Sequence, residues 1–140
     1  ASQSQHRMNL TFAQVDEAIA MAAMYTANHL PVRAIAALTE SGATPLWMSR
    51  ISSNVPIYAL TGHVGTRRKV TLYRGVYPVA FETTTSDHAE VNRAAIDELR
   101  RLGSVRDGDM VIITKGDLTG VLGGTNAMKI ATVGNLPDFS

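Results

Sequence analysis

The chain has 140 residues and a formal net charge of +1, with acidic and basic residues mixed along its length. This length fits one globular domain, and the charge balance gives no basic surface for nucleic acid or for an anionic membrane. The absence of cysteine excludes disulfides, thiolate nucleophiles and thiolate metal sites. No apolar run reaches the length of about 20 residues that a membrane helix needs, so we expect a cytoplasmic protein.

The first structured segment is predicted to be a helix followed by a buried strand. Thr11 and Gln14 have the spacing of a capping box, and apolar residues at helical intervals continue to about His29. Pro31 ends this helix. The wholly apolar run 34–38 predicts a strand that is covered on both faces.

Two further helices and strands follow in alternation. Thr44, with a proline after it, has the features of a helix N-cap. The apolar run 56–60 predicts a second strand, and the residues after it predict a basic helix that includes 67–69. Residues 76–81 then predict a third strand.

The last part of the chain predicts one amphipathic helix and two strands. Residues 86–87 open the helix and Gly103 closes it. Residues 110–114 and 128–133 predict strands. The segment between these strands is too short for a crossover helix, so we expect them to be antiparallel neighbours.

Together these elements follow the order α-β-α-β-α-β-α-β-β. This order favours a three-layer α/β/α sandwich with a mainly parallel five-stranded sheet, in which the last strand is antiparallel. We assign residues 1–10 to a linker or cut edge and residues 11–140 to the domain. In such sheets ligands bind beyond the carboxyl ends of the strands, where the strand order reverses. The loops to examine are therefore 39–45 and 115–127.

The first loop has the composition of a phosphate-binding cradle. It supplies three hydroxyl groups, one glycine that permits close backbone approach, and free amides at the positive end of the next helix. The alternative is an ordinary helix cap that binds nothing. The candidate phosphate-binding residues are Thr39, Glu40, Ser41, Gly42, Ala43 and Thr44.

The second loop is rich in glycine and has a lysine at its base. Its composition suits a segment that folds over a ligand, with the lysine supplying a positive charge. The alternative is a flexible hairpin whose lysine side chain is exposed to solvent. Both loops are predicted to leave the same end of the sheet, which strengthens each candidate. The candidate residues here are Lys115, Gly120, Gly123, Gly124 and Thr125.

No catalytic, metal or cofactor-binding residue is predicted. The four histidines are scattered and lack a spaced carboxylate partner. Asp97 and Glu98 point in different directions on one helix and form no acid–base pair. The basic run 67–69 is interpreted as a solvated face, with contact to a phosphate or to a neighbouring subunit as the alternative.

Four stretches of the sequence resemble, in order, the C-terminal domain of pyruvate kinases. The resemblance extends from about His6 to Val133, and the motifs follow one another in the same order as in that family. The stretches are Glu17–Met21 continued by Ala27–Leu30, the Thr-x-Ser-Gly-x-Thr loop of residues 39–44, Leu72-Tyr73-Arg74-Gly75-Val76-x-Pro78, and Gly123-Gly124-Thr125-Asn126.

The details of the first loop resemble bacterial pyruvate kinases that respond to AMP or sugar monophosphates. Glu40 stands where relatives activated by bisphosphates often carry lysine or glutamine, and a carboxylate there would repel a second phosphate. Ala43 stands where some relatives have arginine, so a charge-assisted contact is missing. The resemblance implies AMP, ribose 5-phosphate or glucose 6-phosphate as the effector.

For the parent enzyme, the resemblance implies phosphoryl transfer from phosphoenolpyruvate to ADP on a (β/α)₈ barrel. Such a barrel needs about 250 residues, so it is absent from this sequence and the chain alone should be catalytically silent. Magnesium and potassium ions are expected in the parent but bound elsewhere, with no cofactor in this chain. The matching region would contribute subunit contacts within a tetramer, and residues 1–10 would be the edge towards the missing barrel.

Two alternatives stay open. A free-standing enzyme on sugar phosphates or nucleotides would need a general base near the first loop, for which Glu40 and Asp117 are the candidates. A purely structural oligomerisation module would leave the loop empty and use the last strand, residues 128–133, as a pairing edge.

Overall fold

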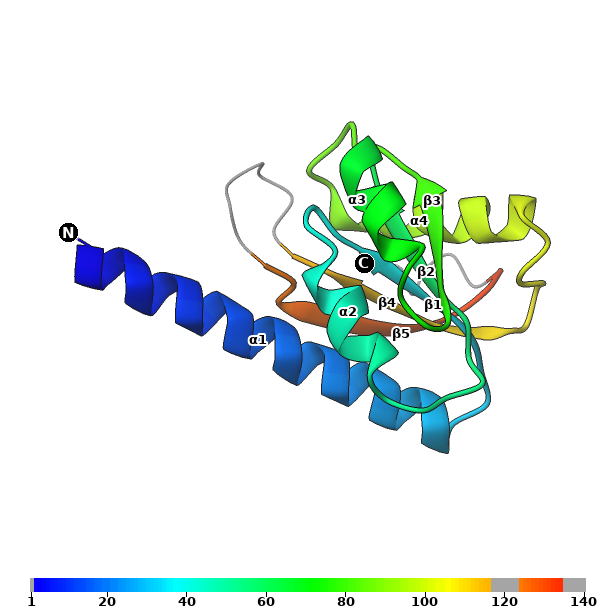
Figure 1. Ribbon diagram of the computed structural model, residues 1–140. Helices are drawn as coiled ribbons and strands as arrows, with labels where there is room; N and C mark the ends of the chain where they lie inside the picture. The colour runs from blue at the N-terminus through cyan, green and yellow to red at the C-terminus, as the bar shows by residue number, and fades with distance from the viewer. Residues whose placement is uncertain (1, 117–123, 135–140) are drawn as a thin grey trace.

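The computed structural model describes residues 2–116 and 124–134, with side chains from Gln14 onward. Within these ranges the chain folds around a single sheet (Figure 1), in the predicted order of helices and strands. The elements are α1 (Ser2–His29), β1 (Val32–Leu38), α2 (Ala43–Ser49), β2 (Ile57–Thr61), α3 (Val64–Val70), β3 (Val76–Ala80), α4 (His88–Arg101), β4 (Met110–Lys115) and β5 (Ala127–Thr132).

The sheet has the strand order β3-β2-β1-β4-β5. β1 pairs in parallel with β2 and β4, and β2 pairs in parallel with β3. β5 runs antiparallel to β4, with Ile130 opposite Ile112. The predicted sheet, mainly parallel with an antiparallel last strand, is confirmed. Since the chain goes to one side of β1 through β2 and to the other side through β4, the strand order reverses between β1 and β4.

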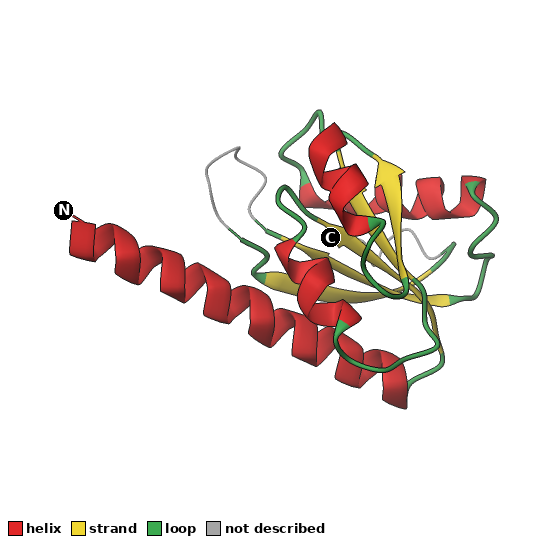
Figure 2. Ribbon diagram, viewed as in Figure 1, coloured by secondary structure: helices red, strands yellow, loops and turns green. Residues whose placement is uncertain are grey.

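Helices cover both faces of the sheet (Figure 2), with α4 on one face and α1, α2 and α3 on the other. Successive residues of β1 alternate between the two cores. Ala34 and Ala36 pack on the side of α4, whereas Ile35 and Ala37 pack on the side of the other helices. A strand covered on both faces has no polar side, which explains its apolar sequence. The predicted three-layer α/β/α sandwich is confirmed.

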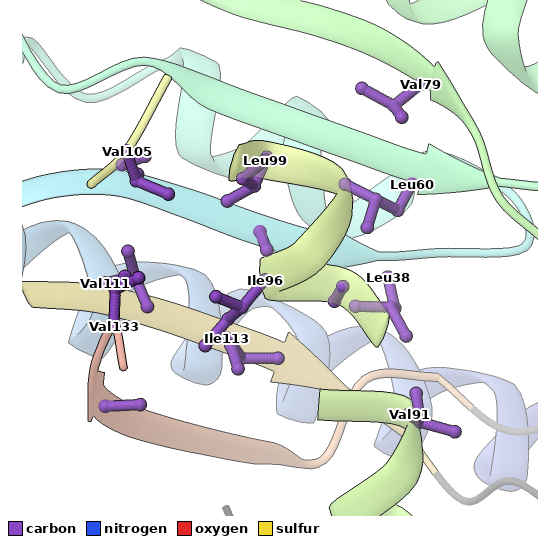
Figure 3. Close-up of a cluster of buried hydrophobic side chains, with 14 residues drawn as sticks. Leu38, Leu60, Val79, Val91, Ile96, Leu99, Val105, Val111, Ile113 and Val133 are labelled. Atoms are coloured by element: carbon purple, nitrogen blue, oxygen red, sulfur yellow. The ribbon is translucent and has the colours of Figure 1, made fainter. Parts of the chain in front are cut away.

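The amphipathic helix α4 closes one of these cores. Ile96 and Leu99 are buried and lie between the strands and the rest of the helix (Figure 3). The side chain of Asp87 caps the helix by accepting a hydrogen bond from the backbone N–H of Ala89 at 3.0 Å. Gly103 follows the end of α4 with a φ of 78°, as expected for a helix stop.

Two predicted helix starts are wrong. α1 begins at Ser2 and not at Thr11, because no glycine or proline interrupts the preceding residues and the helix continues through the capping-box pattern. α2 has Gly42 and not Thr44 as its N-cap, since the preceding loop already caps the first amides. The division into a linker at residues 1–10 and a domain stays a prediction.

α1 is the longest helix of the described chain, and its N-terminal turns (blue) extend past the sheet (Figure 1). Its later turns pack on the sheet through Ala20, Ala23, Met24 and Ala27. Over the residues that the structure describes, no helix is both long enough and apolar enough to span a membrane.

Candidate functional site

The loops that follow β1 and β4 start side by side at the point where the strand order reverses. β1 and β4 are parallel neighbours, and Ala37 lies opposite Thr114 at their carboxyl ends. The first loop consists of residues 39–42, because α2 already begins at Ala43. The fold therefore places this loop at the edge of the sheet where ligands of α/β proteins bind.

Hydroxyl groups of the first loop cap the loop's own backbone amides. The N–H of Gly42 donates to Oγ1 of Thr39 at 2.8 Å, and the N–H of Ala43 donates to Oγ of Ser41 at 3.2 Å. The expectation of free amides is therefore wrong for these two residues. Because each hydroxyl oxygen accepts from an amide, its own proton points away from that amide and is available to another acceptor.

The same loop is anchored to α3. Oγ1 of Thr66 donates to the backbone carbonyl of Glu40 at 2.6 Å, and the Glu40 carboxylate contacts Nε2 of His63. Gly42 has a φ of 86°, and a Cβ atom at this position would lie 3.1 Å from Cγ1 of Val70. Glycine is therefore required at residue 42 both for the backbone conformation and for close packing on α3.

Asp16 of α1 connects the two candidate loops. Its Oδ1 accepts a hydrogen bond from Oγ1 of Thr44 at 3.3 Å and another from the backbone N–H of Thr125 at 2.5 Å. Gly124 packs directly on this carboxylate, since a Cβ there would lie 2.3 Å from Oδ1 of Asp16. Three segments that are far apart in the sequence thus meet at one buried carboxylate.

The environment of Asp16 perturbs its protonation. The residue is only 7% exposed, and this burial raises the pKa of its carboxyl group, while the hydrogen bonds from Thr125 and Thr44 act in the opposite direction. Our sequence reading missed Asp16. The available signal was its position one helical turn before Ala20 and two turns before Ala23, on the buried face of the helix.

Lys115 lies on the other face of the sheet from Asp16. Its side chain is 6% exposed, and Nζ donates to Oδ1 of Asn92 in α4 at 2.5 Å. Burial lowers the pKa of Lys115, and the nearby charge of Lys129 lowers it further. The alternative of a lysine that faces water is therefore wrong, whereas a contribution of its positive charge to ligand binding stays a prediction.

The structure therefore assembles some of the candidate residues and separates others. Thr39, Glu40, Ser41, Gly42 and Ala43 form one continuous loop, and Asp16 brings Thr44, Gly124 and Thr125 together. Lys115 is held on the face of α4. Two further candidates, Gly120 and Gly123, lie outside the described residues.

The described residues of the two loops are suited to hydrogen bonding. In the described part of the chain, no group of three or more histidine, aspartate or glutamate side chains could hold a metal ion. Hydroxyl donors in a half-exposed loop, beside the N-terminus of a helix, are groups that can bind an anionic ligand.

By its fold, the chain is a three-layer α/β domain, and its two candidate loops lie where the strand order reverses. The family described as "Pyruvate kinase, alpha/beta domain" matches residues 17–131, which is most of the chain. The chain belongs to this family, as its sequence motifs indicated.

Individual relatives agree with this assignment. The chain is 47% identical over 131 residues to pyruvate kinase II of Salmonella typhimurium and 43% identical over 114 residues to a pyruvate kinase of Haemophilus influenzae. It is 37% identical over 129 residues to a pyruvate kinase of Staphylococcus aureus.

The matches cover most of this chain but a small part of each relative. They cover 93%, 81% and 92% of this chain and 27%, 24% and 22% of the respective relatives. The chain thus spans about a quarter of the length of the relatives that it matches, and corresponds to the α/β domain of a kinase.

Proposed function

We propose that this chain is the regulatory domain of a pyruvate kinase, and that it binds a phosphorylated metabolite at residues 39–44. AMP, ribose 5-phosphate and glucose 6-phosphate are the candidate effectors. Membership of the pyruvate kinase family supports the proposal, as does the position of the loop at the switch point of the sheet. A cytoplasmic location is part of the same proposal.

The observation that carries this proposal is the pair of capping hydroxyls. Oγ1 of Thr39 and Oγ of Ser41 each accept from a backbone amide, so both O–H groups are directed away from those amides. A donor that also accepts a hydrogen bond is polarised and binds an anion more strongly. A phosphate held by these O–H groups would be linked through them to the amides of Gly42 and Ala43.

The charge around the loop favours a single phosphate group. The loop itself contains no arginine or lysine, so the anion would rely on its neutral donors, on the partial charge at the start of α2 and on the nearby Lys69, whose Cε lies 3.5 Å from a Cβ atom built at Gly42. Glu40 adds a negative charge, which the contact with His63 holds at one side of the loop. A second phosphate close to Glu40 would be repelled, whereas a sugar hydroxyl could donate to its carboxylate.

In the parent enzyme, we propose that this domain modulates phosphoryl transfer from phosphoenolpyruvate to ADP. The magnesium and potassium ions of that reaction would be bound by the barrel, and no catalytic residue is assigned to this chain. Effector binding would change contacts between subunits and thereby the distant active site. Coupling of this kind typically amounts to about 1–3 kcal/mol.

Calorimetric titration of the 140-residue chain with the three effectors tests this proposal. We expect binding at millimolar concentrations or below, and a loss of affinity of at least about tenfold in Ser41→Ala, since a hydrogen bond to a charged group contributes about 1.5–3 kcal/mol. Ser52→Ala is the matched control, because Ser52 is exposed but lies outside both candidate loops. Absence of binding for every effector, or equal affinity in wild type and Ser41→Ala, would contradict the proposal.

The same titrations address the enzymatic alternative. Asp117, one of its two candidate bases, lies outside the described residues, and Glu40 is engaged with His63. Hydrolysis or isomerisation of the added phosphosugar by the pure chain would favour this alternative. We expect the ligands to remain unchanged.

A role in subunit assembly has its own structural support. β5 is an edge strand whose only described neighbour in the sheet is β4, and Ile130 on it is 42% exposed. Exposed strand edges tend to pair with another chain. We propose that β5 contributes to a contact between subunits, and expect Ile130→Lys to shift the chain towards monomer in light-scattering measurements. An unchanged mass distribution would argue against this contact.

A further inference from the structure

The Asp16 carboxylate is buried together with both of the residues that donate to it. Its Oδ1 accepts from two donors of different segments, the hydroxyl of Thr44 and the backbone N–H of Thr125. Both belong to the residues singled out for phosphate binding. Gly124 leaves room for the carboxylate, because a Cβ at this position would lie 2.3 Å and 2.6 Å from its two oxygens.

Asp16 has no cationic partner among the residues that the structure describes. The ion pairs there join other side chains, and none of them involves Asp16. An ionised carboxylate that is buried without a counter-charge depends on its hydrogen-bond donors. The burial that raises the pKa of Asp16 is consistent with such a dependence.

We propose that Asp16 is a built-in competitor of the effector phosphate, because its carboxylate occupies the donors of Thr44 and Thr125 and its negative charge opposes a second anion beside them. This inference rests on the proposed function. It names the residue that sets the affinity of the site for a phosphate group. Removal of the charge at residue 16 should therefore strengthen phosphate binding.

The competition also links ligand binding to the rest of the fold. The bond between Asp16 and Thr125 ties α1 to the residue that lies two positions before β5. A phosphate that accepts hydrogen bonds from these donors in place of Asp16 would break this connection. Binding would then alter the contact between α1 and β5, the strand proposed above for subunit contacts.

The direct test compares Asp16→Asn with wild type in calorimetric titrations with ribose 5-phosphate. Asparagine keeps the size and one acceptor oxygen of aspartate but removes the charge. We expect affinity to rise by at least about tenfold, as expected when a like charge close to the ligand is removed from a poorly solvated site. Glu17→Gln is the matched control, because it also removes one negative charge, at the next residue of α1. The Glu17 side chain has no described contact to either loop, so this variant should bind as wild type does.

The outcomes separate this inference from the function on which it rests. Tighter binding by Asp16→Asn, with the affinity of Glu17→Gln unchanged, supports the inference. Detectable binding by Asp16→Asn, with none by wild type or Glu17→Gln, supports it as well. Equal affinities in wild type and Asp16→Asn overturn it and leave the proposed function standing. Absence of binding in all three proteins overturns the proposed function together with this inference.

A second variant and a spectroscopic measurement keep the test independent of calorimetry. Gly124→Ala places a Cβ atom on the Asp16 carboxylate and should displace it, so this variant should also bind ribose 5-phosphate more tightly than wild type. In amide NMR spectra, the Thr125 N–H should resonate far downfield in wild type and move upfield in Asp16→Ala. A Thr125 resonance that is the same in both proteins would contradict the described bond and the proposal built on it.

Discussion

The backbone N–H of Thr125 donates to Oδ1 of Asp16 at 2.5 Å, across 109 positions of sequence. This hydrogen bond joins the first helix to the segment that leads into the last strand. Through Thr44, the same oxygen also holds the first turn of α2. The candidate site is therefore connected to a residue of α1, although the loop itself lies between β1 and α2.

The first prediction concerns the effect of pH on stability through Asp16. Its raised pKa means that the folded state holds the proton of this carboxyl group more tightly than the unfolded state does. The stabilising contribution is thus fully present in acid, below the ordinary carboxyl pKa, and is lost as the pH rises through the raised pKa. At neutral pH we therefore expect Asp16→Asn to be more stable than wild type.

Chemical denaturation of both proteins across the acid to neutral range measures this effect. The difference in unfolding free energy between Asp16→Asn and wild type should shrink as the pH falls. Glu98 has a lowered pKa and therefore acts in the opposite direction, but it is present in both proteins and cancels in the difference. A difference that does not depend on pH would contradict the assignment of a raised pKa to Asp16.

Substitution of Gly42 should destabilise the domain. Its φ of 86° is unfavourable for alanine, and a Cβ atom would lie 3.1 Å from Val70. We expect Gly42→Ala to lower the unfolding free energy by about 1–3 kcal/mol. Gly65→Ala is the matched control, because Gly65 lies within α3 with open space around it and should gain up to about 1 kcal/mol. Equal effects of the two substitutions in denaturant titrations would show that residue 42 does not need glycine.

The core beneath α4 should respond strongly to truncation. Leu99 is fully buried in the cluster of Figure 3, so Leu99→Ala should lower the unfolding free energy by about 2–5 kcal/mol. Leu102, which caps the same helix, is 44% exposed, and Leu102→Ala should change stability by less than about 0.5 kcal/mol. Similar losses for the two variants would mean that α4 does not pack as described.

Lys115 gives a prediction for the alkaline range. Burial lowers its pKa, so the folded state binds this proton less tightly than the unfolded state does. The stabilising contribution is present above the ordinary lysine pKa and is lost as the pH falls through the lowered one. Lys115→Gln keeps a donor for Asn92 without the charge, and should therefore lose less stability than wild type as the pH falls from alkaline to neutral. Identical pH profiles would contradict this prediction.

The fold could be predicted because its signals are local and periodic. The apolar run of β1, the amphipathic face of α4 and the short connection between β4 and β5 each favour one arrangement, and the structure has that arrangement. Order along the chain was enough to place the loop of residues 39–42 at the switch point. The starts of two helices could not be predicted from local capping patterns. At Thr11 the helix continues through the capping pattern, and at Thr44 the helix already has its N-cap at Gly42.

The site could be predicted only in part, because its contacts depend on segments distant in sequence. Nothing near Thr125 in the chain indicates that its amide binds a carboxylate of α1. The face on which Lys115 lies follows from strand alternation and register, which require the pairing partner to be known. The capping of Gly42 and Ala43 by neighbouring hydroxyls is a local feature, and the composition of the loop suits it as well as it suits a phosphate cradle.

An NMR titration of the chain with ribose 5-phosphate would show where the ligand binds. We expect the resonances of the backbone amides of Gly42, Ala43 and Thr125 to shift progressively and to saturation. Gly75 lines a cavity near the amino end of β3, away from the first loop, and its amide resonance should not shift. Spectra in which the amides of residues 42 and 43 do not move, or in which the changes gather around Gly75, would contradict a phosphate site at the end of β1.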